Sequence, residues 1–203
     1  SSGNSAEGER QNNAYFYEIG LPFSDQVLVS GAYRFDSYSD VGSKGVPSLK
    51  IEYRPIDDLL VRGSASKGFR AASLSQLLAQ DAEGNPTVTD YGRCKQAGIT
   101  FDKCPSAQQL TLYKSNSNLA PESSTYLNIG LVYSGVENLT AKLDLFDVEV
   151  TGVIGTPDTQ DLIYAELAGK LPEMQKKYPG IVFTRNAQGA LNNVVTSNYN
   201  GAV

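Results

Sequence analysis

The chain has 203 residues, with 17 Lys or Arg against 22 Asp or Glu and no His. The mild negative charge argues against nucleic acid as a partner, and the lack of His excludes the common catalytic triads and His-ligated metal sites. No apolar run approaches the roughly 20 residues of a spanning helix, which excludes helical membrane insertion. We expect no catalytic site, no metal site and no cofactor.

The first segment, residues 1–13, is polar and rich in Gly, Asn and Ser, and we predict an N-terminal loop there. It lacks the apolar region of a signal peptide. We therefore expect that processing removed such a peptide or that the chain is an internal piece.

Apolar and polar residues alternate with a period of two in six segments, which predicts six strands. The predicted strands are residues 14–22, 27–37, 47–54, 59–67, 125–133 and 139–150. Tight turns at Ser24, Asp57 and Gly135 force neighbouring strands into an antiparallel meander. Between the other strands we predict a loose Gly/Ser loop at residues 39–46 and a long loop, residues 68–123, that holds both cysteines.

The predicted strands carry charged residues on one face and aromatic residues near their ends. The charged set is Lys50, Glu52, Arg54, Arg62, Lys142 and Asp144, and the aromatic set is Tyr15, Tyr17, Tyr33, Phe35, Tyr53 and Tyr133. A transmembrane barrel shows this pattern, with a polar lumen and aromatic girdles. A soluble sandwich also alternates, so composition alone leaves both structures open.

After the sixth strand the chain changes character, in residues 151–203. Asp158 is a candidate N-cap for a short helix, and a second helical stretch runs from Pro172 to Tyr178. We expect helix only between Asp158 and Tyr178. Residues 181–185 and 190–195, separated by a turn, predict a hairpin.

Two segments that flank the long loop carry a family resemblance. Residues 68–77 read GFRAASLSQL and residues 118–124 read NLAPESS. They resemble the GFRAPSLxEL and NLKPExS segments of TonB-dependent outer-membrane receptors, in the same order and each next to a predicted strand. Ala72, Gln76 and Ala120 depart from the usual Pro, Glu and Lys.

The resemblance implies an all-β fold, an antiparallel up-and-down meander that forms part of a transmembrane β-barrel. Residues 14–150 would supply barrel strands and the long loop 68–123. Residues 151–203 would form a large extracellular loop with a short helix, since the order of helix, Pro-Gly and hairpin is similar to a loop in some receptors of the family.

The implied function is nutrient uptake at the outer membrane of a Gram-negative bacterium. The substrate would be a bulky, scarce nutrient, either an iron-siderophore, cobalamin or an oligosaccharide. The expected partners are outer-membrane lipid and a TonB-type energy-coupling protein, which would act through a plug absent from this chain. The alternatives are a soluble β-rich binding or adhesion module and, weakened by the missing His, an outer-membrane lipase or protease.

The long loop would lie outside the cell, where disulfides persist, so we predict a bond between Cys94 and Cys104. Ile99 and Phe101 are expected to pack beneath it. The candidate substrate contacts are Arg70, Tyr91, Arg93, Lys95, Phe101 and Tyr113. For the aromatic residues the alternative is packing within their own loop, and for Arg70 it is a role in the architecture of the rim.

Overall fold

The computed structural model describes residues 7–201. Residues 1–6 of the predicted N-terminal loop and residues 202–203 therefore lie outside the described part. The chain divides into two compact units. We call Arg10–Ala71 together with Ala120–Gly152 the sheet unit. The loop unit comprises Ala72–Leu119, Val153–Val203 and the segment that ends at Glu9.

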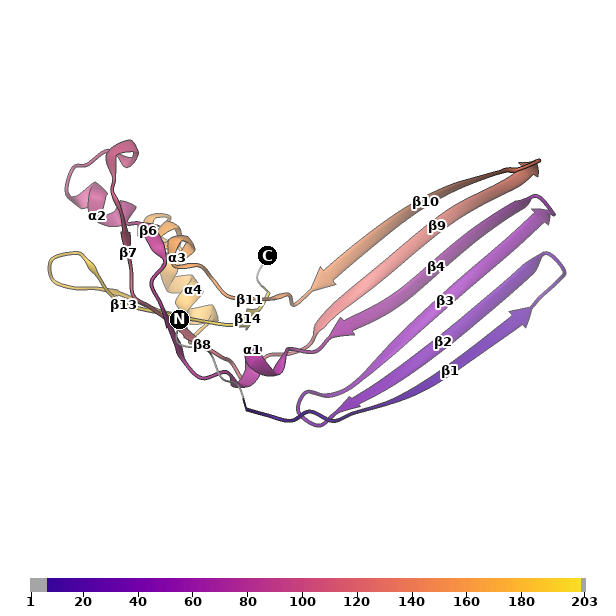
Figure 1. Ribbon diagram of the computed structural model, residues 1–203, viewed down its shortest axis with the longest axis horizontal. Coiled ribbons are helices and arrows are strands. Elements are labelled where there is room, and N and C mark those ends of the chain that lie inside the picture. Colours follow the sequence, from indigo (N-terminus) through magenta and orange to yellow (C-terminus); the bar gives the residue numbers. More distant parts are fainter. Residues whose placement is uncertain (1–6, 202–203) are drawn as a thin grey trace. The chain divides into compact units, whose positions relative to one another are not determined.

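The sheet unit is a six-stranded meander in chain order, as the sequence predicts (Figure 1). Every neighbouring pair is antiparallel. Its strands are β1 (Asn12–Pro22), β2 (Val27–Tyr38), β3 (Gly42–Ile56), β4 (Leu59–Arg70), β9 (Glu122–Val136) and β10 (Leu139–Thr151). The tight turns after β1, β3 and β9 confirm the predicted turns near Ser24, Asp57 and Gly135.

One predicted connection is wrong. Residues 39–46 do not form a loose loop, because β3 begins at Gly42 and its first residues pair with the end of β2, from Tyr38↔Gly42 to Arg34↔Val46. Gly42 has a φ of 78°, a backbone conformation that suits glycine in a tight turn. Continuous backbone pairing therefore outweighs the low strand propensity of the Gly and Ser residues.

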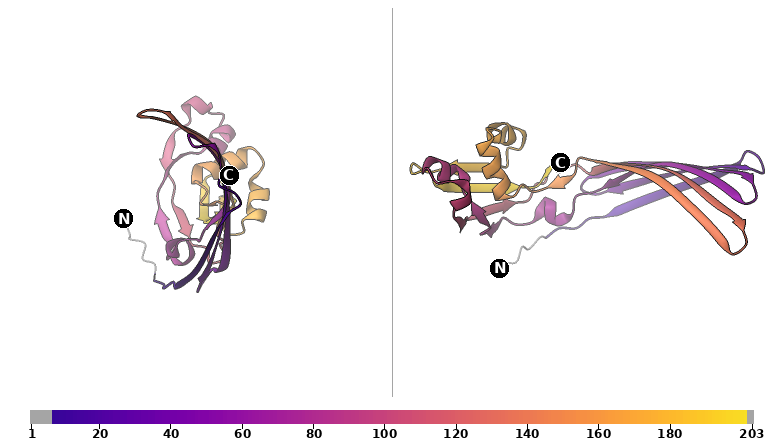
Figure 2. Two further views of the ribbon diagram at one scale, coloured as in Figure 1. Left: turned by 90° about the vertical axis from the view of Figure 1, so that its right-hand side faces the viewer. Right: turned by 90° about the horizontal axis from the view of Figure 1, so that it is seen from above.

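The six strands form a single curved layer (Figure 2). The residues on its two faces differ in chemical character. The register aligns Ile51, Gly63, Ile129 and Leu145 in one row of what we call the apolar face. Lys50, Ser64 and Asn128 form a row of the opposite, polar face. The apolar face is not covered within the described residues, since Leu143 and Leu145 are each 63% exposed.

On the polar face an ion pair crosses a strand. The Nη2 atom of Arg62 in β4 lies 2.8 and 2.9 Å from the carboxylate oxygens of Asp144 in β10. Gly130 of β9 stands between these residues in the register, and a Cβ there would overlap both side chains. Gly130 of β9 thus provides the space in which the ion pair links β4 to β10.

The loop unit confirms the predicted helical region and hairpin. Helices α3 (Thr159–Leu167) and α4 (Leu171–Lys177) precede the antiparallel strands β12 (Val182–Arg185) and β13 (Leu191–Ser197). Asp158 caps α3, since its side chain accepts from the backbone N–H of Gln160. Of the helices in residues 7–201, none has the length and apolar character needed to cross a membrane.

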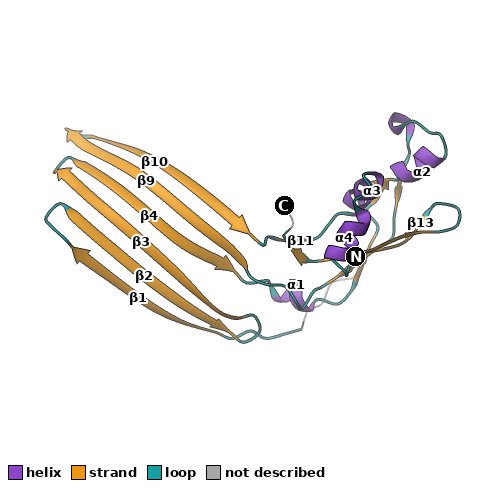
Figure 3. Cartoon of the chain, turned by 180° about the vertical axis from the view of Figure 1, so that it is seen from behind, coloured by secondary structure: helices purple, strands orange, loops and turns teal. Residues whose placement is uncertain are grey.

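The expectation that helix is confined to Asp158–Tyr178 is wrong, because the long loop carries its own elements (Figure 3). In α1, Ser73 and Gln76 form a reciprocal capping box, which supplies a local reason for the helix. The additional elements are α1 (Leu74–Leu78), β5 (Ala82–Gly84), β6 (Thr87–Thr89), α2 (Tyr91–Gln96), η1 (Phe101–Lys103), β7 (Ser106–Gln108), β8 (Thr111–Lys114), β11 (Ile154–Gly155) and β14 (Tyr199–Asn200).

The two long segments of the loop unit share one hydrophobic core. Strand β13 pairs in parallel with β8, in a sheet of order β12-β13-β8-β5. The buried cluster consists of Val88, Leu162, Ile163, Leu171, Ile181, Phe183 and Val194. Val88 belongs to the segment 72–119, and the other residues belong to the segment that begins at Val153. The two segments therefore fold as one body.

Replacing Leu162 tests this shared core. Leu162 is completely buried, so we expect Leu162→Ala to destabilise the loop unit by about 2–5 kcal/mol through lost burial and a cavity. Hydrogen exchange followed by mass spectrometry should show faster exchange in both β8 and β13. Lys176→Ala, an exposed change on α4, is the control and should leave both strands unchanged. Faster exchange in β13 alone would contradict a common core.

Candidate ligand-binding site

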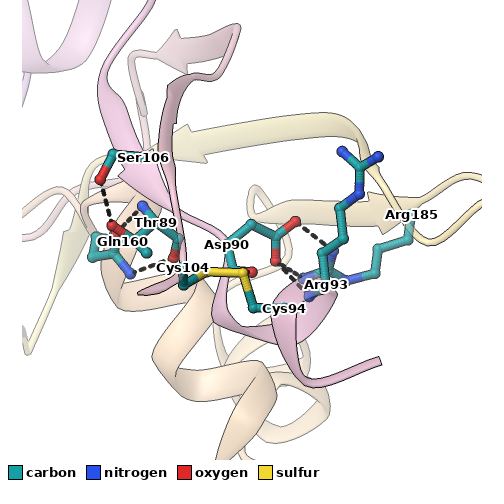
Figure 4. Close-up of a disulfide and its surroundings, with 8 residues drawn as sticks. All are labelled: Thr89, Asp90, Arg93, Cys94, Cys104, Ser106, Gln160 and Arg185. Carbon is teal, nitrogen blue, oxygen red and sulfur yellow. Dashed lines mark hydrogen bonds and ion pairs between the residues drawn. A yellow bond between two sulfur atoms is a disulfide. The ribbon is translucent and has the colours of Figure 1, made fainter. Parts of the chain in front are cut away.

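The predicted disulfide between Cys94 and Cys104 is present, with the two Cα atoms 5.8 Å apart. Cys94 lies in α2 and Cys104 directly follows η1. The bond closes a loop with a sequence separation of 10, for which chain entropy gives roughly 2–3 kcal/mol of stabilisation. Figure 4 shows the bond beside Asp90, Arg93 and Arg185.

The expectation that Phe101 packs beneath the disulfide is wrong, whereas Ile99 lines the same cavity as Cys94. Ile99 is 40% exposed and Phe101 is 56% exposed. The Phe101 ring instead contacts Tyr91, with ring centroids 5.0 Å apart, and Tyr91 stacks on Tyr164 at 5.9 Å. The short η1 turn places Phe101 against Tyr91 of α2, which the spacing of residues in the sequence does not show.

A clamp centred on Arg185 joins three parts of the loop unit. Its Nη1 and Nη2 atoms donate to the Asp90 carboxylate at 2.8 and 2.7 Å. Its Nε and Nη2 atoms donate to the Glu166 carboxylate at 2.7 and 2.6 Å. Charge-assisted, bidentate bonds of this kind are the strong ones, so β12 is fixed to the N-terminus of α2 and to α3.

The clamp also sets the ionisation of its members. The hydrogen bonds to Glu166 and Asp90 raise the pKa of Arg185 above its ordinary value. Burial alone would raise the pKa of Asp90, but the side-chain hydrogen bonds from Arg185, the backbone N–H of Arg93 and the two positive charges lower it overall. Asp90 therefore stays charged in the folded loop unit.

A cavity of about 610 Å³ opens beside the disulfide, within the size range of small-molecule sites. Its apolar lining includes Val88, Cys94, Ala97, Ile99, Pro105, Ala107, Ala190 and Leu191, and its polar lining is Asp90, Arg93, Gln108 and Gln109. Asp90 is already bound by Arg185. The cavity therefore combines an apolar wall with a small set of polar groups.

Arg93 is the cationic residue in the lining of this cavity. Its backbone N–H donates to the Asp90 carboxylate, which caps α2. Its guanidinium points away from that carboxylate (Figure 4). Within residues 7–201 the guanidinium forms no hydrogen bond or ion pair. An anionic group that enters the cavity would thus meet an unpaired cation.

The other predicted contact residues lie in different surroundings. Lys95 is exposed on α2, outside the lining of the cavity. Tyr113, on β8, is half-buried, with its ring beside Gly84. Arg70 ends β4 in the sheet unit and forms a two-pronged ion pair with the buried Glu122. Of the candidates, the structure thus brings Tyr91 and Phe101 into contact, while Arg93 lines the cavity.

The pairing of Arg70 with Glu122 explains part of the two sequence motifs. Arg70 belongs to the first motif and Glu122 to the second, and the two residues are opposite one another in the register of β4 and β9. Sequence reasoning missed three residues of the loop unit, Tyr164, Glu166 and Arg185. Their partners are far away along the chain and no motif marks them, so the sequence holds no signal for them.

Lowering the pH should release the clamp. A carboxyl group whose folded pKa is depressed contributes stability that is complete above its unfolded pKa, about 4 for Asp. That contribution is lost as the pH falls through the lower folded pKa. We expect hydrogen exchange in residues 88–97, corrected for the intrinsic rate, to accelerate below about pH 4. In Asp90→Asn the acid-induced step should be much smaller, and an unchanged step in that variant would contradict the assignment to Asp90.

Comparisons with known proteins agree with this architecture. The family model described as "TonB dependent receptor-like, beta-barrel" matches residues 1–190. The probable TonB-dependent siderophore receptor PirA of Acinetobacter baumannii is 26% identical over 163 residues, covering 77% of this chain and 20% of that protein.

Two solved structures share the fold at low sequence identity. The siderophore receptor PirA from Acinetobacter baumannii superposes with a TM-score of 0.61 at 19% identity, covering 97% of this chain and 25% of that chain. A mutant of the ferric enterobactin receptor PfeA from Pseudomonas aeruginosa gives 0.62 at 15% identity, covering 94% and 23%. The chain therefore spans between a fifth and a quarter of the length of these relatives. The match over residues 1–190 shows that this chain belongs to the TonB-dependent receptor family and forms part of its β-barrel.

Proposed function

We propose that the chain is a segment of an outer-membrane receptor that takes up a ferric siderophore. The sheet unit supplies wall strands and the loop unit supplies substrate recognition. The observation that carries this proposal is the ordered state of the loop unit, which has its own core, a disulfide and a cavity of about 610 Å³. A preordered site loses less entropy when its ligand binds.

The choice of a siderophore follows the named relatives. PirA is described as a siderophore receptor and PfeA as a ferric enterobactin receptor. Cobalamin and oligosaccharides have no such support among these relatives. Because the relatives are receptors, the proposed role is transport and not enzymatic catalysis.

The faces of the sheet unit support a place in the outer membrane of a Gram-negative bacterium. The apolar face would meet lipid and the polar face would meet the barrel lumen, as in transmembrane β-barrels. Energy would come from a TonB-type partner, which acts through a plug encoded outside this chain. The soluble binding or adhesion module is the alternative, and its apolar face would need another cover.

Within the loop unit, three exposed candidates are suited to direct contact with the ligand. Arg93 lines the cavity, while Lys95 and Phe101 are exposed on α2 and η1. We propose that Tyr91 acts indirectly by supporting Phe101. Tyr113 would contribute from β8, and Arg70 would maintain the rim through Glu122.

Iron uptake tests the proposed function. The gene region that encodes this chain should also encode a plug and further strands. A strain that lacks the complete gene should lose uptake of radiolabelled iron from at least one ferric siderophore, and the gene should restore it. Uptake of every siderophore at the parental rate, together with loss of cobalamin or oligosaccharide uptake, would contradict the proposal. Recovery of the protein in the soluble fraction would instead support the alternative module.

Arg93→Gln tests the cavity itself. The variant keeps a helix-forming residue and a polar side chain but removes the unpaired charge. We expect the full-length protein to bind a negatively charged ferric siderophore about tenfold more weakly, because a charge-assisted hydrogen bond contributes at least about 1.4 kcal/mol. Titration calorimetry in detergent measures the effect. Lys176→Gln, an exposed change on α4, is the matched control, and equal affinities for the two variants would exclude Arg93 as a contact.

A further inference from the structure

A furrow runs along β4 on the apolar face of the sheet unit. The β4 residues on this face include Gly63 and Ala65, which have no side chain or a single methyl group. In the register Gly63 lies between Ile51 and Ile129, and Ala65 lies between Leu49 and Leu127. These four flanking side chains are 44–58% exposed. They form two apolar ridges, with the furrow between them.

The end of this furrow near Ala65 and Lys67 is a cavity. It has a volume of about 260 Å³ and is lined by Pro47, Ser48, Leu49, Ala65, Ser66, Lys67 and Thr125. Lys67 lies two residues beyond Ala65 and on the same face, so its ammonium group stands at the end of the furrow. Within the described residues Lys67 is exposed and forms no hydrogen bond or ion pair.

A polar row places Lys67 at the edge of the apolar band. The register aligns Lys67 with Thr125 of β9 and Glu149 of β10. Next to this row lie Ala65, Leu127 and then Asp147. Arg70 and Glu122 mark the ends of β4 and β9 that continue into the loop unit. Farther from these ends, the residues on this face are apolar. Glu149 is two strand spacings from Lys67, about 9–10 Å between backbones, so an anion at Lys67 lies nearer to the cation than to that carboxylate.

We propose that this furrow binds an acyl chain of a phosphorylated membrane lipid, with the lipid phosphate on Lys67. The apolar ridges exclude water from the chain, and the unpaired ammonium group complements the charge of the phosphate. The occupant is a lipid and not a free anion, because the cation terminates an apolar furrow. The inference rests on the proposed lipid-facing placement of the apolar face, but not on the identity of the nutrient.

Filling the furrow is a direct test. A Cβ at Gly63 would approach only the backbone oxygen of Asn128, at 3.8 Å. Gly63→Val therefore adds two methyl groups from a Cβ that meets no close contact, and a β-branched residue suits a strand. The matched control is Gly31→Val, on the same face of β2, where a Cβ would meet only Ile19 Cγ2 at 3.8 Å. Lys67→Gln removes the charge, and Lys142→Gln, on the polar face, is its control.

Lipid binding is measured on the full-length protein in detergent by native mass spectrometry, with lipid A as the phosphorylated lipid. Gly63→Val and Lys67→Gln should each lower the retained fraction about tenfold, while both controls stay within twofold of the wild type. Lipid A stripped of its phosphates should bind the wild type as weakly as phosphorylated lipid A binds Lys67→Gln.

Three results would overturn the proposal. One is equal retention by all four variants, and the second is equal binding of phosphorylated and stripped lipid. The third is displacement of the lipid by millimolar inorganic phosphate, which would indicate a site for free anions only. Siderophore uptake should be unchanged in Gly63→Val. A protein that transports no siderophore but retains lipid in this pattern would contradict the proposed function and leave the lipid site standing.

Discussion

The backbone hydrogen-bond ladder of the six-stranded sheet is the constraint on which the sheet unit depends. The unit has one layer, so its strands are held by their antiparallel neighbours and not by a core between layers. The ladder fixes the register, and the register decides which face each side chain occupies. A shift by one residue would move the row of Ile51 and Ile129 to the charged face. The chemical difference between the faces thus follows directly from the pairing.

The loop unit is stabilised differently. It buries Leu162, Ile163 and Val194 almost completely, and it adds a disulfide and the Arg185 clamp to this core. The clamp and the disulfide meet at α2, since Asp90 caps that helix and Cys94 lies within it. A helix of only six residues is marginal by itself. The cross-links therefore account for the ordered position of Arg93 beside the cavity.

The strands were predictable because a period of two is a local signal that repeats over many residues. The cysteine pair was predictable as well, since the chain has only two cysteines. The first residues of β3 were missed because pairing with β2, and not their own propensity, makes them a strand. The short helices α1 and α2 were missed because each has fewer residues than two helical turns.

The clamp could not be predicted, because Asp90 and Arg185 are 95 residues apart and no pattern connects them. The direction of Phe101 depends on the η1 turn, which comes directly before Cys104 and which no sequence pattern marks. The contact between Arg70 and Glu122 was hidden for a related reason. Both residues were visible in motifs, but only the register of β4 with β9 shows that they face one another.

The central claim is that the sheet unit is a membrane wall with a lipid face and a lumen face. It is tested most directly by spin labels placed one at a time at residues 127–132 of β9 in the full-length protein, reconstituted in lipid vesicles. Collisions with oxygen, which partitions into lipid, should be highest at 127, 129 and 131. Collisions with a water-soluble nickel complex should be higher at 128, 130 and 132. Access of the nickel complex to all six positions, or a loss of the alternation, would contradict the account.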